Sequence, residues 1–279
     1  MTIRSAVSAR DALDGAITAI GAGGSSSARL DAELLLADAL GVTRERLAVD
    51  PQLAIEGGAV RRFQSYVRRR SVEREPVAYI LGTRAFRHIV LSVDARVLVP
   101  RSETELLVEV AAELESGLRV LDCCTGSGAV ALALKDERDD LEVTGSDVSE
   151  SALAVARANG VRLGLHVSWR RADLLDGLDE RFDAVIANPP YIPSAVLSTL
   201  EPEVSRHEPA IALDGGSDGL AVISRLIDQA DRASVSALAL EHGAGQADAV
   251  AGLCDEAGFR TIERRRDLAG IERVLLARR

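Results

Sequence analysis

Aromatic residues and cysteines are scarce in this sequence. The first scarcity limits which residues can build the core, and the second excludes a fold held by disulfides or zinc. Phe, Trp and Tyr together make up 3% of the 279 residues, so the core must be built mainly from Leu, Val, Ile and Ala. Three cysteines, two of them adjacent (Cys123 and Cys124), form neither a disulfide framework nor a zinc ligand set. The four histidines are scattered. We therefore expect a reduced, cytosolic and metal-free protein.

Long hydrophobic runs and positive net charge are also absent. No apolar stretch approaches the roughly 20 residues that span a bilayer, and residues 1–5 are not followed by the apolar run of a secretory signal. The net charge of −10 argues against extended binding to a phosphate backbone. Arginines nevertheless cluster at residues 61–62, 68–70 and 264–266. We interpret these clusters as solvated helix faces or strand ends; the alternative is a basic patch for a partner that itself touches RNA.

Residues 1–75 have helical spacing. Ser27 and Gly41 are suited to begin and end one helix. Two apolar stripes indicate helices, namely Leu30, Leu34, Ala37 and Leu40 in the first and Val60, Phe63 and Val67 in the second. The pattern predicts a small helical bundle that contains no obvious chemistry.

Residues 76–100 change to an alternating pattern. Apolar side chains recur at every second position from Ile89 to Val93, and an apolar triplet follows at residues 97–99. This pattern predicts a β-hairpin that links the bundle to the rest of the chain. Helical spacing resumes over residues 103–114.

From residue 119 onward, strand and helix patterns alternate. The predicted strands lie at about residues 120–121, 141–146, 166–170, 184–187, 237–240, 260–264 and 273–277. Such alternation implies a mostly parallel sheet covered by helices on both faces. We therefore expect an α/β domain over residues 101–279, with residues 76–100 as the linker.

Glycines and acidic residues follow three successive strands of this predicted sheet. Gly126 and Gly128 open the helix after the first strand, where glycine lets the backbone approach a ligand. Asp147 ends the second strand, placed to accept hydrogen bonds from ribose hydroxyls, and Asp173 follows the third, where it could accept from an adenine amino group. Alone, each could be a helix-entry turn or a helix cap. Together they predict a site for NAD or S-adenosylmethionine.

The sequence Asn188-Pro189-Pro190-Tyr191 ends the fourth predicted strand. Two prolines forbid both strand pairing and an immediate helix, which fixes the asparagine side chain at the edge of the sheet. The Asn188 side-chain oxygen and the Pro189 carbonyl can each accept a hydrogen bond from a planar NH₂ group, and Tyr191 can cover its flat face. The alternative is a proline-terminated strand with a surface tyrosine.

This motif has no role in hydride transfer, and the glycine turn lacks the full Gly-x-Gly-x-x-Gly of a dinucleotide site. S-adenosylmethionine is therefore favoured over NAD. The residues predict methyl transfer to an amide or to an exocyclic base amine, with no need for a histidine or cysteine nucleophile.

Longer segments resemble the peptide-chain release factor glutamine methyltransferases, also called HemK or PrmC. The resemblance runs from about Glu75 to the end of the chain and includes residues 75–82, 98–105, 182–193, 207–220 and 240–243. It implies a Rossmann-like class I S-adenosylmethionine-dependent methyltransferase with a seven-stranded sheet. It also implies methylation of the N5 amide nitrogen of the glutamine in the Gly-Gly-Gln motif of class 1 release factors, which the N-terminal bundle would contact. A cytoplasmic monomer that binds neither nucleic acid nor membrane is expected.

The resemblance also implies the residues of two sites. The cofactor would be lined by Cys124, Thr125, Gly126, Ser127, Gly128, Asp147, Asp173, Leu174 and Asn188. The glutamine would be held by Asn188, Pro189, Pro190 and Tyr191, of which Asn188, Pro189 and Tyr191 would be catalytic.

Two cysteines depart from the family pattern. The family usually has glycine where Cys124 stands and an aliphatic residue where Cys123 stands, so Cys124 adds a side chain at a close-packed turn. The pair could form a redox switch, but we favour inert small side chains. Two rival functions remain open: a nucleic-acid adenine or cytosine amino methyltransferase, and a non-catalytic paralogue that binds release factor.

Overall fold

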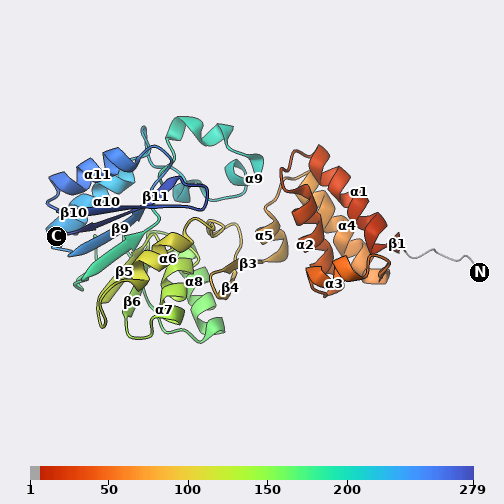
Figure 1. The fold of residues 1–279 in the computed structure, drawn as a ribbon, viewed down its shortest axis with the longest axis horizontal. Helices are drawn as coiled ribbons and strands as arrows, with labels where there is room; N and C mark the ends of the chain where they lie inside the picture. The colour runs from red at the N-terminus through yellow and green to blue at the C-terminus, as the bar shows by residue number, and fades with distance from the viewer. Residues whose placement is uncertain (1–6) are drawn as a thin grey trace, which may run out of the picture. The chain divides into compact units, whose positions relative to one another are not determined.

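The computed structural model describes residues 7–279, so the prediction made on residues 1–5 lies outside the described residues. The chain divides into two compact units (Figure 1). The first unit comprises Met1–Gly82, of which residues 7–82 are described, together with Glu201–His207. The second unit comprises Thr83–Leu200 and Glu208–Arg279. The first unit thus contains a segment that lies far along the sequence, within the range predicted for the methyltransferase domain.

The first unit is a helical bundle, in agreement with the resemblance. Its helices are α1 (Ala9–Ala22), α2 (Ala28–Leu40), α3 (Arg44–Val49), α4 (Gly57–Ser71), α5 (Val77–Leu81) and α9 (Pro202–Ser205). Two short strands, β1 (Val7–Ser8) and β2 (Ala54–Ile55), pair antiparallel. The core between the helices is built from side chains such as Ile20, Leu35, Leu36 and Phe63.

Helix α2 ends as predicted but buries a different face. Gly41 adopts a left-handed conformation with φ of 67°, which suits a residue without a side chain. Ser27 does not cap a backbone N–H; its hydroxyl donates to Asp31 Oδ1 at 2.9 Å. Leu30 is exposed, whereas Leu35 and Leu36 are fully buried. The predicted stripe was wrong in part because α2 packs against α1, α4 and α5, so more than one side of it is covered.

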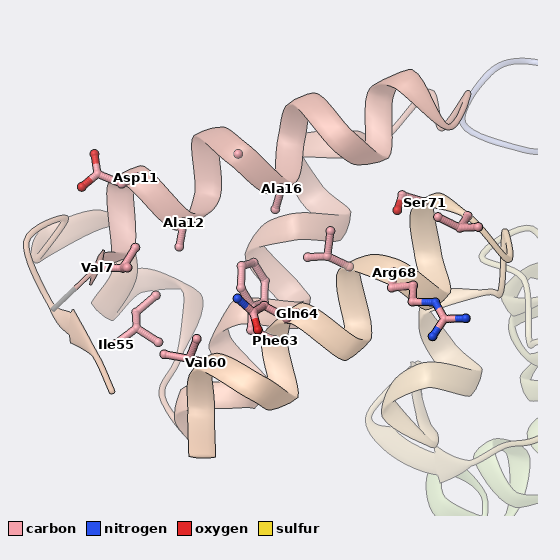
Figure 2. Close-up of a pocket in the computed structure, with 13 residues that line it drawn as sticks. Val7, Asp11, Ala12, Ala16, Ile55, Val60, Phe63, Gln64, Arg68 and Ser71 are labelled. Carbon is pink, nitrogen blue, oxygen red and sulfur yellow. The ribbon is translucent and has the colours of Figure 1, made fainter. Parts of the chain in front are cut away.

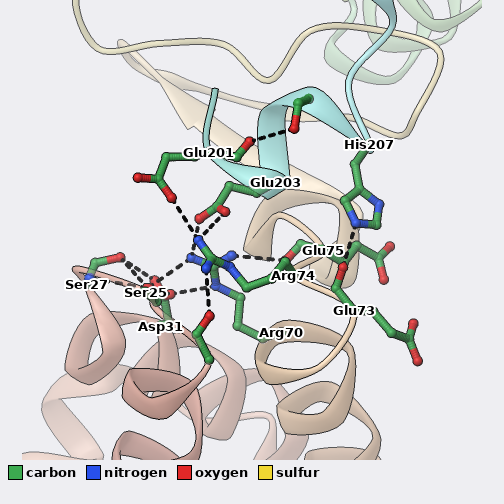
Figure 3. Close-up of polar contacts among 12 residues, drawn as sticks. Ser25, Ser27, Asp31, Arg70, Glu73, Arg74, Glu75, Glu201, Glu203 and His207 are labelled. Atoms are coloured by element: carbon green, nitrogen blue, oxygen red, sulfur yellow. Dashed lines mark hydrogen bonds and ion pairs between the residues drawn. The ribbon is translucent and has the colours of Figure 1, made fainter. Parts of the chain in front are cut away.

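A polar cluster of the first unit holds the returning segment (Figure 3). The Arg70 side chain is only 6% exposed; its Nε donates to Asp31 Oδ2 at 2.7 Å and its Nη2 to Glu203 Oε1 at 3.0 Å. Arg74 pairs with the same Glu203 and with Glu201. The interpretation of residues 68–70 as a solvated face is therefore wrong for Arg70, because its charge is paired inside the unit.

The second unit is built around a seven-stranded sheet, as predicted. Its strands are β5 (Arg119–Cys123), β6 (Glu142–Asp147), β7 (Ser168–Arg171), β8 (Ala184–Ala187), β9 (Ala237–Glu241), β10 (Thr261–Arg266) and β11 (Glu272–Arg278). The order is β10-β11-β9-β8-β5-β6-β7. Strands β5 to β9 run parallel to their neighbours within the group, and β11 is antiparallel to both β9 and β10.

Helices cover both faces of this sheet (Figure 1). One face carries α6 (Glu105–Ala112), α7 (Ala129–Glu137) and α8 (Glu150–Leu163); the other carries α10 (Ala221–Arg232) and α11 (Ala247–Glu256). Two short 3₁₀ helices, η1 (Ser194–Thr199) and η2 (Ala210–Ala212), lie in the loops. All four residues of β8 are buried, which explains why its sequence is a continuous apolar run rather than an alternating one.

One strand of the predicted hairpin, at residues 89–93, is present, but its partner precedes it and does not lie at residues 97–99. The strands of the hairpin are β3 (Thr83–Phe86) and β4 (Ile89–Ser92), which pair antiparallel. Residues 77–81 form helix α5, and residues 97–99 do not form a strand. Val97 and Val99 are buried from a loop, so their apolar character reflects burial without strand pairing. No helix among residues 7–279 is long and apolar enough to cross a membrane.

Candidate functional site

A cavity of about 450 Å³ opens at the carboxyl ends of β5, β6 and β8 in the second unit. This edge is where open α/β sheets bind ligands. Seven of the residues singled out from the sequence line it, namely Cys124, Gly126, Asp147, Asp173, Leu174, Asn188 and Pro190. These seven residues end or follow four strands, β5 to β8, and line one cavity.

Five other residues singled out from the sequence do not line this cavity: Thr125, Ser127, Gly128, Pro189 and Tyr191. Thr125 and Ser127 are buried beneath it. Gly128 has φ of 83°, and a Cβ at this position would lie 2.9 Å from the ring of Trp169. Thr125, Ser127 and Gly128 therefore belong to the turn but do not line the cavity.

The turn between β5 and α7 is held by two carboxylates, of which Asp122 is buried and Asp147 half-buried. Asp147 Oδ2 accepts from Gly126 N at 3.0 Å, and its Oδ1 accepts from Ser149 N at 2.9 Å. Asp122 Oδ2 accepts from Thr125 Oγ1 at 2.5 Å and from Ala131 N at 3.0 Å. Burial raises the pKa of Asp147, and it raises the pKa of Asp122 to about 7. Each oxygen of Asp147 keeps a second lone pair, so the side chain can still accept from ligand hydroxyls.

Asp122 was missed by the sequence reasoning. It lies inside β5 and is 1% exposed, whereas the predicted strand ended at residue 121 and no role was assigned to Asp122. A carboxylate within a buried strand is unusual enough to have been a signal.

Asp173 lies at the outer part of the cavity. Its Oδ2 is 2.6 Å from Arg225 Nη2, and the two side chains are about half exposed. Loop residues 209–212 and 96–98 complete the lining. Parts of both loops fell within segments that resembled the family, but no role was assigned to them from the sequence.

Asn188 is oriented by a residue that precedes helix α6. Its Nδ2 donates to the Thr104 Oγ1 at 3.0 Å, and Thr104 is buried. Thr104 occupies the N-cap position of α6 but makes no side-chain bond to the helix backbone, so its hydroxyl serves Asn188 instead. With Nδ2 engaged in this way, Oδ1 remains as the acceptor that Asn188 can present to a ligand.

Tyr191 is held at both its hydroxyl and its backbone. Its hydroxyl donates to Glu241 Oε1 at 3.1 Å, and its carbonyl accepts from Gln246 Nε2 at 3.1 Å. Burial, followed by the nearby Glu241, raises the pKa of the Tyr191 phenol. The phenol therefore stays protonated and remains a donor.

The vicinal cysteines lie at the start of the turn. Cys124 has φ of 60°, a left-handed conformation that favours glycine, and its Sγ is 4.0 Å from that of Cys123. Hydrogen bonding to Cys123, together with burial, raises the pKa of the Cys124 thiol well above its usual range. A protonated thiol is a poor nucleophile. The raised pKa favours the interpretation of the pair as inert side chains, which stays a prediction.

The first unit has a separate groove of about 380 Å³ between α1 and α4 (Figure 2). Its floor is apolar and includes Ala16, Ile55, Val60 and Phe63. Among residues 7–279, no group of three or more His, Cys, Asp or Glu side chains could hold a metal ion.

Comparison with known proteins identifies both units. The PrmC N-terminal domain model matches residues 11–82, and the methyltransferase small domain model matches residues 102–200. A release factor glutamine methyltransferase of Caulobacter vibrioides is 39% identical over 255 residues, covering 88% of each chain. One from Mycolicibacterium smegmatis is 38% identical over 282 residues, covering 97% of each chain.

Among solved structures, a methyltransferase from Pyrococcus furiosus shares the fold, with a TM-score of 0.51 and 16% identity over 67% of this chain and 87% of that one. Because identity to the named relatives extends over both units, the chain belongs to the release factor glutamine methyltransferase family.

Proposed function

We propose that this protein transfers a methyl group from S-adenosylmethionine to the N5 amide nitrogen of the glutamine in the Gly-Gly-Gln motif of class 1 release factors. One observation carries the chemical part of this proposal. Asn188 lines the cavity at the end of β8 with its Nδ2 donating to Thr104, so its Oδ1 is available to accept from a substrate NH₂ group. Family membership supports the choice of a release factor glutamine as that substrate.

The cavity suits a nucleoside cofactor. Its volume of about 450 Å³ falls within the usual range for small-molecule sites. Asp147 would accept from the ribose hydroxyls, Asp173 from the adenine amino group, and the backbone at Gly126 would lie against the ligand. When bound, S-adenosylmethionine would supply a methyl group attached to a positively charged sulfur, and would leave as neutral S-adenosylhomocysteine once the bond between sulfur and methyl carbon is broken.

The side-chain amide of glutamine is a weak nucleophile because its nitrogen lone pair is delocalised into the carbonyl. Asn188 Oδ1 and the Pro189 carbonyl would each accept one of its N–H groups and hold the nitrogen in line with the methyl group. Positive charge develops on that nitrogen as the new N–C bond forms, and the two acceptor dipoles stabilise it. The nitrogen then loses one proton to water, so no side-chain base is required.

The first unit would recognise the release factor. This part of the proposal rests on the match of residues 11–82 to the PrmC N-terminal domain, because the sequence of the bundle shows no chemistry of its own. S-adenosylmethionine would remain in the second unit, where all residues of the cavity lie.

A nucleic-acid amino methyltransferase would use the same Asn-Pro-Pro-Tyr geometry but would need a basic surface. The arginines at 264–266 instead pair with acidic side chains, including Asp248, Glu272 and Glu113. Such pairing leaves little positive charge for a phosphate backbone.

Methyl transfer from labelled S-adenosylmethionine would test the proposal, with release factor, RNA and DNA offered separately. We expect label only on release factor, and none on a release factor in which the glutamine of the Gly-Gly-Gln motif is replaced by alanine. Label confined to RNA or DNA would favour the nucleic-acid rival. A folded protein that binds the cofactor without transferring label would favour the non-catalytic paralogue.

A further inference from the structure

Glu241 is a buried carboxylate that the proposed mechanism does not use. It ends β9 and is 1% exposed, and its Oε2 has no hydrogen-bond partner among the described residues. A buried carboxylate oxygen without a partner is destabilising, because burial removes its water and supplies no hydrogen bond in return. A position that carries this cost beside a reaction site is a candidate for a functional role.

The parallel register places Glu241 beside the substrate motif. Ala187 of β8 pairs with Leu240 of β9, so the next residue on each strand is Asn188 and Glu241. Glu241 Oε1 accepts from the Tyr191 hydroxyl at 3.1 Å. The hydroxyl of Thr104, which accepts from Asn188, is near enough to Glu241 to lower the pKa of that carboxyl. The carboxylate therefore bonds to Tyr191 at one end of the Asn-Pro-Pro-Tyr motif and lies near the residue that holds Asn188 at the other.

We propose that Glu241 and Thr104 are positioning residues that fix the orientation of the Asn188 amide for substrate binding. An ionised carboxylate can only accept hydrogen bonds, so it directs the Thr104 hydroxyl hydrogen toward itself. The Thr104 oxygen then presents its lone pair to Asn188, whose NH₂ group must turn toward it. Asn188 Oδ1 consequently faces the substrate, and the bond from Tyr191 to Glu241 holds the aromatic ring in the same network.

This inference rests on the proposed function, and the charges around Glu241 support it. Burial raises the pKa of Glu241 to about 7, and the nearby Glu103 acts in the same direction. The hydroxyls of Thr104 and Tyr191 oppose that rise, as does the positive charge of Arg273 on β11. Protonation near neutral pH would let Glu241 donate, which would release the Thr104 hydroxyl and the Asn188 amide from their fixed directions.

Four variants and one control of the full-length protein separate this role from a structural one. Glu241→Met and Thr104→Val remove the acceptor and the hydroxyl with little change of shape. Thr104→Ser keeps the hydroxyl, and Glu241→Gln keeps one acceptor oxygen but adds a donor, as protonation of the carboxylate would. Glu263→Gln removes a carboxylate from β10, at the far edge of the same sheet, and serves as the control. Each variant is measured for kcat and KM with release factor, and for S-adenosylmethionine affinity by calorimetry.

We expect Glu241→Met and Thr104→Val to lower kcat about 100-fold, as misplacement of a reacting group commonly does, with KM and cofactor affinity within about threefold. Thr104→Ser should keep at least about a tenth of kcat, because the hydroxyl survives, whereas Glu241→Gln should show the low kcat of the wild type with Glu241 protonated, because its amide can donate as the protonated acid does. Wild-type kcat should rise with pH through about 7, and this dependence should be absent in Glu241→Gln. The pKa of Asp122 is also raised to about 7, so Asp122 is a second possible source of the pH dependence of kcat. Loss of that pH dependence in Glu241→Gln therefore assigns the dependence to Glu241.

The side-chain NH₂ signal of Asn188 in a nitrogen-15 correlation spectrum provides a readout without substrate. It should shift in Glu241→Met and Thr104→Val but not in Glu263→Gln. An unchanged signal, kcat within about threefold of wild type in Thr104→Val, or a pH dependence that persists in Glu241→Gln would overturn the inference. Failure of the wild-type protein to methylate release factor would instead overturn the proposed function, while the Asn188 signal would still test the positioning role.

Discussion

Arg70 and Glu203 are 133 residues apart in the sequence, and their side chains form an ion pair of 3.0 Å inside the first unit. The Arg70 side chain is 6% exposed and that of Glu203 is 19% exposed. The helical unit is therefore completed by a segment that begins ten residues after Tyr191. The chain that follows the substrate motif enters the first unit at Glu201 and leaves it at His207.

Replacing Glu203 by alanine should destabilise the first unit. The change leaves Arg70 with Asp31 as its remaining carboxylate partner in a buried position, and we expect a loss of about 1–3 kcal/mol. This loss of stability can be measured by amide hydrogen exchange in α2 and α4 of the full-length protein. The matched control is Glu201→Ala, whose side chain is 70% exposed, with an expected effect below about 0.5 kcal/mol. Equal effects of the two changes would contradict a special role for the buried pair.

Stability should depend on pH through Glu241. The pKa of Glu241 is raised in the folded protein to about 7, from an ordinary value of 4.5. The folded state is therefore more stable when Glu241 is protonated than when it is ionised. This contribution is fully present below about pH 4.5 and is lost as pH rises through about 7. The side chain in the Glu241→Gln variant stays neutral at every pH. The melting temperature of this variant should therefore rise relative to that of the wild type as the pH increases from 5 to 8. A constant difference in melting temperature across this range would show that Glu241 does not titrate there.

Asn188→Ala should abolish methyl transfer. The substitution removes the Oδ1 acceptor for the substrate NH₂ but only one of the many contacts around the cavity. S-adenosylmethionine affinity should therefore stay within about tenfold of wild type, a cost near 1.4 kcal/mol, as measured by calorimetric titration. Retained turnover in this variant would remove Asn188 from the assigned role.

Cys123 and Cys124 should react slowly. Cys123 is 1% exposed and the pKa of the Cys124 thiol is raised, so little thiolate is present at neutral pH. Mass spectrometry after brief treatment with iodoacetamide should find both thiols unmodified in the folded protein and alkylated after unfolding. A parallel treatment with hydrogen peroxide tests the redox switch, because rapid loss of two hydrogens from the pair would mean that a vicinal disulfide forms.

The sheet could be predicted because its strands carry a local signal. Residues 184–187 form an uninterrupted apolar run that ends at Asn188, and acidic residues mark the ends of β6 and the segment after β7. Parallel strands bring such ends to one edge. Six of the nine residues expected at the cofactor, among them Gly126, Asp147 and Asp173, therefore line one cavity.

Other features depend on contacts between distant residues, which leave no local pattern. Arg70 resembles its exposed neighbours in sequence, and its burial depends on Asp31 and Glu203. Thr104 precedes an ordinary helix, and Glu241 ends an ordinary strand; their relation to Asn188 and Tyr191 exists only through the register of β8 and β9. The hairpin was displaced for a related reason, since burial of Val97 and Val99 from a loop resembles strand pairing in a sequence.

Methylation of the release factor glutamine can be measured by mass spectrometry of the peptide that contains the Gly-Gly-Gln motif, after incubation with this protein and S-adenosylmethionine. We expect a peptide heavier by one CH₂, with fragmentation that places the addition on the glutamine side chain. We expect no addition with Asn188→Ala. An unmodified peptide from a folded, cofactor-binding wild-type protein, or a methyl group on another residue, would contradict the proposed function.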